Sequence, residues 1–221
     1  MKFRRKAPSE GSASQDPQDL AAQDQTVQDQ AAEEPAAAPT APGGPYDVAE
    51  LSDDLERVDV GALLIAPSPG RELRLQVNEK TGQVAAVLLA GPDGAMEFQV
   101  FAAPRNGDLW AEVRPQIAED LTRRGGRVAE REGRFGTELA CQMPVKRSDG
   151  TDAVQPSRII GINGSRWMLR ASLLGRPAID PDSSGEWEDA LALVAVRRGS
   201  HALPVGQPLP FTLPDDAHKA E

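Results

Sequence analysis

The stretch RIIGINGSRWMLRASLLG, residues 158–175, predicts a β-hairpin on which the rest of the domain is arranged. Two apolar runs meet at Asn163-Gly164, the dipeptide that most readily adopts the positive φ angles of a tight turn. Side chains alternate along a strand, and the expected core face carries Trp167, Leu169, Ala171 and Leu173. The opposite face, expected to be cationic and partly wet, carries Arg166, Met168, Arg170 and Ser172.

Upstream of the hairpin, residues 57–103 predict an antiparallel meander. Four runs of strand-forming residues lie at 58–66, 71–79, 83–90 and 95–103. The turns between them are marked by PSPG at 67–70, KTG at 80–82 and GPDG at 91–94. Short connections of this kind join neighbouring antiparallel strands, so we expect one meandering sheet.

Two helices are predicted, one on each side of the hairpin in the sequence. Asp108 is the expected N-cap of the first, whose apolar stripe is Trp110, Val113, Ile117 and Leu121. Pro115 lies inside this helix, so the helix either kinks there or begins later. The second helix is predicted to begin at the capping box of Ser183 and Glu186, with Trp187, Leu191 and Val194 in its buried stripe.

The second half of the chain completes the predicted sheet. Strands are expected at 127–132 and 135–145, followed by a polar loop over residues 146–157. Residues 193–198 fit either the end of the second helix or a last strand. The order of elements favours an α+β fold: a mostly antiparallel sheet of about six to eight strands with two main helices packed on it.

The domain boundaries follow from changes in composition. Residues 1–45 are an acidic low-complexity tail rich in Ala, Pro and Gln, predicted to be disordered. Residues 46–199 are expected to form one α+β domain. Residues 200–214 read as an extended, proline-rich segment packed on that domain, and residues 215–221 as a disordered end.

Composition and charge limit the classes of function. The chain has 221 residues and a net charge of −10, which argues against general binding of polyanions. Its one cysteine, Cys141, excludes an intramolecular disulfide and fits a reducing compartment. The basic start MKFRRK is not followed by an apolar run, and no stretch approaches the roughly 18 apolar residues of a membrane span. We therefore expect a cytoplasmic protein without a membrane segment.

Four short motifs carry a resemblance to a known family. They are RVDVG at 57–61, DLWAE at 108–112, GINGSRWMLR at 161–170 and RRG at 197–199. With these motifs, residues 45–214 resemble an actinobacterial family of uncharacterised proteins, domain of unknown function family 3710. Pro115 departs from the pattern expected of the first helix. The resemblance implies a source and a cytoplasmic setting, but no activity or site.

No reaction is indicated by the residues that usually perform chemistry. His201 and His218 lie in the C-terminal region, outside the spacing of metal ligands, and Cys141 has the strand parity of a buried residue. The sequence lacks GxGxxG, GxxxxGK[ST], GxSxG and HExxH. We predict no catalytic residue, no metal site and no cofactor.

Two sets of residues are candidates for binding. Trp110, Trp167 and Trp187 are expected to anchor the helices on the sheet, or alternatively to line a groove for a ligand. Arg158, Arg166 and Arg170 belong to a segment, residues 126–176, with nine basic and five acidic residues. They form either a solvated face or an anion-binding patch.

Three classes of function follow, in descending order. The first is a non-catalytic interaction module for a protein partner, and the second is a nucleic-acid-associated protein that uses the arginines. The third is a small-molecule enzyme with an unrecognised site. The sequence does not indicate an oligomeric state.

Overall fold

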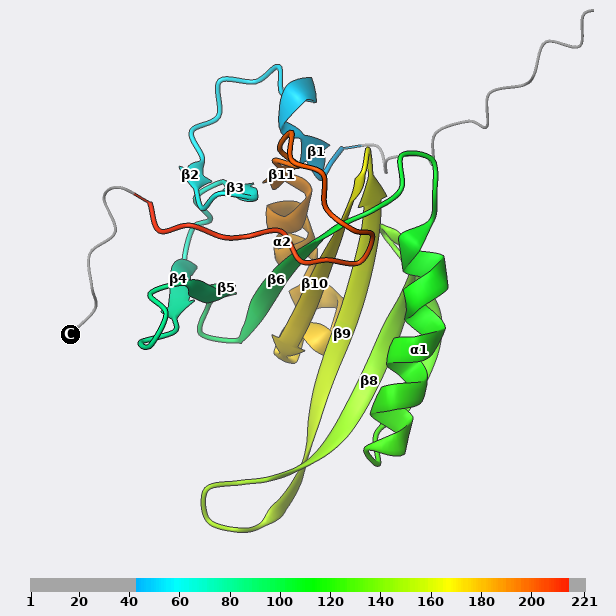
Figure 1. Cartoon of the computed structure of the whole chain (residues 1–221). Helices are drawn as coiled ribbons and strands as arrows, with labels where there is room; N and C mark the ends of the chain where they lie inside the picture. The colour runs from blue at the N-terminus through cyan, green and yellow to red at the C-terminus, as the bar shows by residue number, and fades with distance from the viewer. Residues whose placement is uncertain (1–42, 215–221) are drawn as a thin grey trace, which may run out of the picture. The chain divides into compact units, whose positions relative to one another are not determined.

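The computed structural model describes residues 43–214, and the expectations for residues 1–42 and 215–221 lie outside this part. A large antiparallel sheet dominates it, with strand order β4-β5-β6-β10-β9-β8-β7 (Figure 1). The bounds are β4 Glu72–Val77, β5 Val84–Ala90, β6 Gly94–Ala102, β7 Arg127–Gly133, β8 Gly136–Lys146, β9 Asp152–Gly164 and β10 Trp167–Gly175. Consecutive strands from β4 to β6 and from β7 to β10 pair as neighbours, as expected from their short connections.

A second, small sheet has the order β1-β11-β3-β2, with bounds β1 Tyr46–Asp47, β11 Ala195–Val196, β3 Leu63–Ile65 and β2 Val58–Asp59. The single strand predicted over residues 58–66 is wrong, because the chain reverses at Val60 to Gly61 and its two arms pair with each other. Gly61 makes this reversal possible with a φ of 86°. β11 also decides the open question about residues 193–198 in favour of a strand. The fold is therefore α+β with a large antiparallel sheet and a small second sheet.

Two α-helices and two 3-10 turns complete the described chain: α1 Leu109–Arg123, α2 Pro181–Ala192, η1 Val48–Glu50 and η2 Arg176–Ala178. Asp108 caps α1 as predicted, accepting a hydrogen bond from the Ala111 amide at 2.8 Å. The helix begins at Leu109 and runs through Pro115, so a later start is wrong. Pro115 and Ala111 are both exposed, so water can replace the hydrogen bond that proline cannot donate.

The start of the second helix differs from its prediction. The cap is Asp180, whose carboxylate accepts a hydrogen bond from the Asp182 amide at 3.1 Å, and Pro181 is the first helical residue. Proline is favoured at this position because the first amides of a helix have no partner within it. The capping box predicted at Ser183 is wrong, since Ser183 already lies in the first turn of α2.

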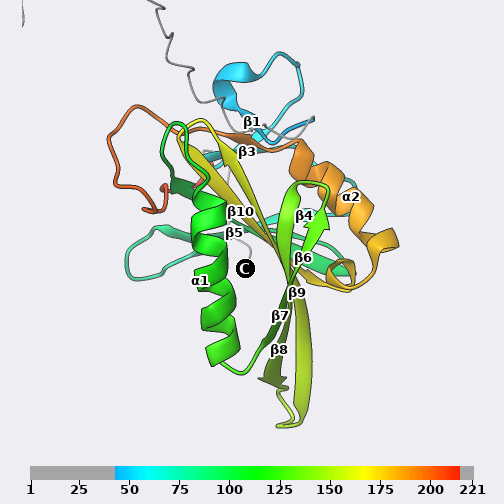
Figure 2. The same cartoon turned by 90° about the vertical axis from the view of Figure 1, so that its right-hand side faces the viewer.

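The core divides into two clusters on opposite faces of the large sheet. The larger cluster contains Trp167 and Leu169 of β10, Trp187 of α2, and residues of the small sheet. The smaller contains Trp110 of α1, Leu139, Cys141 and Met168. Figure 2 shows α1 and α2 on either side of the strands. Alternate residues of β10 therefore enter different clusters, and the face expected to be wet is covered by α1 at Met168.

The turn of the opening hairpin lies two residues later than predicted. β9 extends to Gly164, which pairs with Trp167, so the turn residues are Ser165 and Arg166. Asn163 stays in the strand because its side chain accepts from the Trp110 amide at 3.2 Å and donates to Asp108 at 2.6 Å. Arg166 takes a φ of 64°, the turn conformation expected for Asn163-Gly164. Its carbonyl accepts from the Ala103 amide at 3.0 Å and from Arg198 Nε at 2.9 Å.

The polar loop predicted over residues 146–157 is wrong in its second half. β9 begins at Asp152, where Lys146 and Asp152 pair across the two strands. An ion pair of 2.7 Å joins their side chains. The polar composition of this segment reflects a solvent-exposed two-stranded ribbon formed by β8 and β9 (Figure 1).

The C-terminal segment lies along β6 where β5 no longer pairs with it. Gly206 donates to the Ala102 carbonyl, Ala102 donates to Gln207, and Leu209 donates to Val100, each at 2.8 Å. Leu209 is buried, and Phe211 forms an isolated bridge to Gly61 in the turn between β2 and β3. The segment therefore fills a free backbone edge in the manner of a strand.

Candidate interaction groove

The structure does not bring the three candidate arginines together. Arg158 is only 2% exposed and lies on the α2 side of the sheet, where it contacts Glu138 and Glu188 at 2.7–2.9 Å. Arg170 lies on the opposite face, donates to Gln99 and stacks 5.3 Å from the Phe101 ring centre. Arg166 lies in the exposed hairpin turn. A common face for all three, as the sequence suggested, does not form.

Arg158, which is buried, and Arg170, which is partly buried, differ in how their charge is compensated. Burial alone would lower the pKa of Arg158, but hydrogen bonds to Glu138 and Glu188 outweigh burial and raise the pKa above its ordinary value. Burial lowers the pKa of Arg170, and the attraction of Glu97 opposes this shift only in part. No ion pair joins Arg170 to a carboxylate within residues 43–214.

The three tryptophans are all buried, in the two core clusters. Each indole N–H group donates a hydrogen bond. The Trp110 indole donates to the Thr137 carbonyl at 2.6 Å, the Trp167 indole to the Asp47 carboxylate at 3.1 Å, and the Trp187 indole to the Asp93 carboxylate at 3.4 Å. The positions match the role of anchors, since each ring is enclosed and its polar edge is satisfied. None of the three is among the residues that line the grooves described below.

The described part of the chain contains one cysteine and one histidine. Cys141 is buried, and burial raises the pKa of its thiol. His201 is exposed in the C-terminal segment. Among residues 43–214, no group of His, Cys, Asp and Glu is arranged to hold a metal ion.

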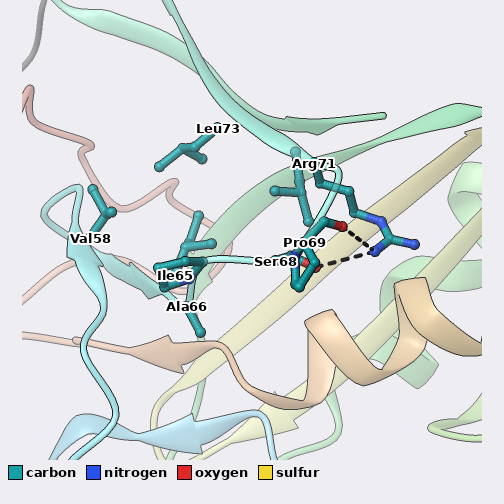
Figure 3. A pocket seen from close by; sticks show the side chains of 9 residues that line it. Val58, Ile65, Ala66, Ser68, Pro69, Arg71 and Leu73 are labelled. Carbon is teal, nitrogen blue, oxygen red and sulfur yellow. Dashed lines mark hydrogen bonds between the residues drawn. The ribbon is translucent and has the colours of Figure 1, made fainter. Parts of the chain in front are cut away.

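An apolar groove that sequence reasoning missed lies where the two sheets meet. Its volume is about 390 Å³, and it is lined by Val58, Ile65, Ala66, Pro67, Ser68, Pro69, Arg71, Leu73 and Leu89. Figure 3 shows Val58 and Ile65 on one side and Leu73 on the other. Val58 belongs to β2 and Leu73 to β4, the strands that end the small and the large sheet. The groove is therefore bordered by two edge strands.

Strand β4 is open to an additional strand. It pairs with β5 on one side, and its other edge has no strand partner among the described residues. Its apolar side chains, Leu73, Leu75 and Val77, are only partly covered, and Val77 is 40% exposed. A sheet edge with unpaired N–H and C=O groups beside exposed apolar side chains is a template for pairing with another chain.

Arg71 closes one end of the groove. Its guanidinium lies 4.4 Å from the Trp187 ring centre and donates to Glu186 at 2.9 Å and to Ser68 at 3.3 Å. Its Nε is buried and has no hydrogen-bond partner. On the other side of the loop at 66–69, a second groove of about 280 Å³ is lined by Glu186, Asp189, Ala190 and Leu193 of the α2 region. This set of residues suits binding rather than bond-breaking chemistry.

A third, more polar groove of about 680 Å³ lies beside β2 and contains Arg57. The Arg57 side chain is 3% exposed and donates to both carboxylate oxygens of Asp53, at 2.7 and 2.9 Å. The hydrogen bond to Arg57 lowers the pKa of Asp53 below its ordinary value, against the opposing effect of desolvation.

Replacing Asp53 with asparagine should therefore change the acid sensitivity of folding. A carboxyl whose pKa is lowered by folding stabilises the fold above its unfolded pKa, and this contribution disappears as pH falls through the folded value. We expect Asp53→Asn to be less stable than the wild type at pH 7, with the difference closing below about pH 4. Urea unfolding at several pH values measures this, with the exposed neighbour Asp54→Asn as the control of equal charge change. A stability difference that stays constant with pH would contradict the prediction.

The fold and the groove define an α+β domain whose two sheets leave an apolar cleft between their edge strands. The chain belongs to the family described as "Protein of unknown function (DUF3710)", which matches residues 44–220. No curated protein matches the chain. A crystal structure from Bacteroides thetaiotaomicron VPI-5482 is similar with 12% identity and a TM-score of 0.37, over 67% of this chain and 51% of that chain. This chain thus spans about half the length of that protein. Within residues 43–214, no helix is both long enough and apolar enough to cross a membrane.

Proposed function

We propose that this protein is a non-catalytic interaction module that binds an extended segment of a protein partner along β4. The observation that carries the proposal is the position of the 390 Å³ apolar groove directly beside the unpaired edge of that strand. In β-augmentation, backbone hydrogen bonds provide affinity and pockets for alternate side chains provide specificity. Both elements are present at β4, with the groove at Leu73 as the pocket.

The chain's own C-terminal segment supports this mode of binding. It forms three backbone hydrogen bonds with β6, and only Leu209 of its paired residues is buried. An extended, proline-rich segment is therefore held at a free edge of this sheet by backbone hydrogen bonds and one apolar anchor. We infer that a partner segment docks on β4 in the same way, through backbone hydrogen bonds and a single apolar side chain in the groove.

The two other classes of function have less support from the geometry. A nucleic-acid site built on the three arginines loses Arg158, which is buried and neutralised by two glutamates. An enzyme needs polar groups converging on a substrate, whereas the groove beside β4 is lined mainly by apolar side chains. The proposal includes a cytoplasmic setting, with which the buried free cysteine Cys141 is consistent. It also includes an actinobacterial source, which the four sequence motifs support.

Selection of peptides from a displayed library of random 12-residue segments on the full-length protein tests the proposal. We expect the selected peptides to alternate apolar residues and to protect the β4 amides from hydrogen exchange. Leu73→Ser should weaken their binding, measured by calorimetry, by about tenfold, because one apolar contact of the groove is lost.

The matched control is Val154→Ser on the exposed ribbon, where the side chain is 62% exposed and far from β4 in the sheet order. It should leave peptide affinity unchanged. Thermal unfolding of both variants separates a loss of binding from a loss of folding. Peptides that bind Leu73→Ser as tightly as the wild type, or a library that yields no binding peptide for protein shown to be monomeric, would refute the proposed function.

A further inference from the structure

The exposed face of β4 is complementary to itself in charge. Glu72 and Arg74 follow each other on this face, and an intrastrand ion pair of 2.8 Å joins them. In an antiparallel pair, residues directly opposite each other lie on the same face. If two copies of β4 pair about a two-fold axis at Leu73, Glu72 of each copy lies opposite Arg74 of the other.

Other symmetric registers are less favourable. An axis at Arg74 would place Arg74 opposite Arg74 of the second copy, and like charges directly opposite destabilise a sheet. An axis at Leu75 would place Glu72 opposite Asn78 and Arg74 opposite Gln76, so neither charge would meet an opposite charge. Of these three axes, only the one at Leu73 places Glu72 and Arg74 opposite each other.

The axis at Leu73 also places apolar side chains of the second copy beside the groove. On this side the groove is lined by Leu73 of β4 and by Arg71, which directly precedes the strand. With the axis at Leu73, these two residues lie opposite Leu75 and Leu73 of the second copy, on the face of the sheet that borders the groove. The two-fold axis makes the contact the same in both copies, so each groove receives the same pair of leucines.

We propose that the strand accepted by β4 is the β4 of a second copy, so that the protein is a symmetric dimer with a sheet continuous across the axis. This inference rests on the proposed function and names its partner. An isologous contact is closed, since each copy has used its β4 edge, so association stops at two copies. The leucines and backbone hydrogen bonds stabilise the contact, and the charges select the register, because exposed ion pairs add little stability.

The full-length chain tests this by sedimentation equilibrium, which should give twice the 23.6 kDa of one chain. Glu72→Arg and Arg74→Glu each place like charges at 72 and 74, so each variant alone should dissociate at least tenfold more readily. An equimolar mixture of the two should form a heterodimer, because the positive strand then faces the negative one. Folding defects cannot produce this recovery, and neither variant retains the intrastrand ion pair.

Glu112→Arg, on the exposed side of α1, is the control with the same change of charge, and it should leave the dimer intact. A wild type that stays monomeric, a dimer insensitive to both β4 variants, or a mixture that does not associate would overturn self-pairing. A monomer that still binds library peptides along β4 would overturn self-pairing alone and leave the proposed function standing. Peptides compete with the second copy for β4, so peptide binding is measured on the dissociated Glu72→Arg variant. Absence of any binding peptide for that monomer would refute the proposed function instead.

Discussion

Replacing Arg158 with methionine should lower the free energy of unfolding by about 3–5 kcal/mol, because it leaves a buried carboxylate without its main partner. Arg158 and Glu138 are 2% and 1% exposed, and two hydrogen bonds of 2.8 and 2.9 Å join them. The remaining partner of Glu138 is Arg131, whose side chain is 40% exposed and shares its charge with solvent. Urea unfolding followed by tryptophan fluorescence measures the effect.

The double variant Arg158→Met with Glu138→Met separates charge from packing. It removes both buried charges, so we expect it to be more stable than Arg158→Met alone, as for other buried ion pairs replaced by apolar residues. Arg74→Met is the matched surface control, because the ion pair of Arg74 with Glu72 is exposed and should change stability by less than about 1 kcal/mol. An Arg158→Met protein as stable as the surface control would contradict the account of the cluster.

The contacts of Arg158 also show which features of the structure could be predicted from the sequence and which could not. Arg158, Ile160 and Ile162 have the same strand parity, so the alternation that predicts the core face includes this arginine. Its partners, however, come from β8 and from α2, 20 and 30 residues away. No local sequence pattern predicts which carboxylates will pair with a given arginine. An isolated arginine on a strand therefore looks like a solvated one until the tertiary structure is known.

The same limit explains the missed groove. The strands β5, β6, β7, β8 and β10 are long enough for alternation to show, and they were predicted close to their observed bounds. The strands of the small sheet have only two or three residues. Such strands are too short for an alternation of apolar and polar residues to be recognised in the sequence. The groove lies between this sheet and β4, so its existence depends on packing between segments that no sequence pattern relates. The sequence did hold one signal, the alternating Leu73, Leu75 and Val77 after a proline-rich turn.

The motif GINGSRWMLR, which carries the family resemblance, has a packing explanation. A Cβ on Gly161 would lie 2.1 Å from the Trp110 ring of α1, and a Cβ on Gly164 would lie 2.1 Å from the Trp167 ring. Asn163, between them, binds the first turn of α1 through the Trp110 amide. The motif therefore allows the Trp110 ring of α1 and the Trp167 ring to pack directly on the backbone of β9, because Gly161 and Gly164 have no side chain at the two points of contact.

Gly161→Ala should consequently destabilise the protein by about 3 kcal/mol or more, near the upper end of the cost of overpacking a core. The added methyl group meets three atoms of the Trp110 ring at 2.1–2.5 Å, and that ring is enclosed and hydrogen-bonded to Thr137. The ring can yield only by moving α1 or by giving up its hydrogen bond. Gly185→Ala is the matched control, because a Cβ there meets nothing within 4 Å and alanine favours a helix by about 1 kcal/mol over glycine.

A double-mutant cycle assigns the cost of Gly161→Ala to the tryptophan. In a Trp110→Leu background, the smaller side chain leaves room for the methyl group, so Gly161→Ala should cost less than about 1 kcal/mol. The coupling energy would then be about 2 kcal/mol or more, which is the range found for residues in direct contact. If Gly161→Ala were equally destabilising in both backgrounds, the glycine would be required by its own backbone rather than by the helix packed on it. The observed backbone argues against that outcome, because Gly161 is not among the glycines with positive φ.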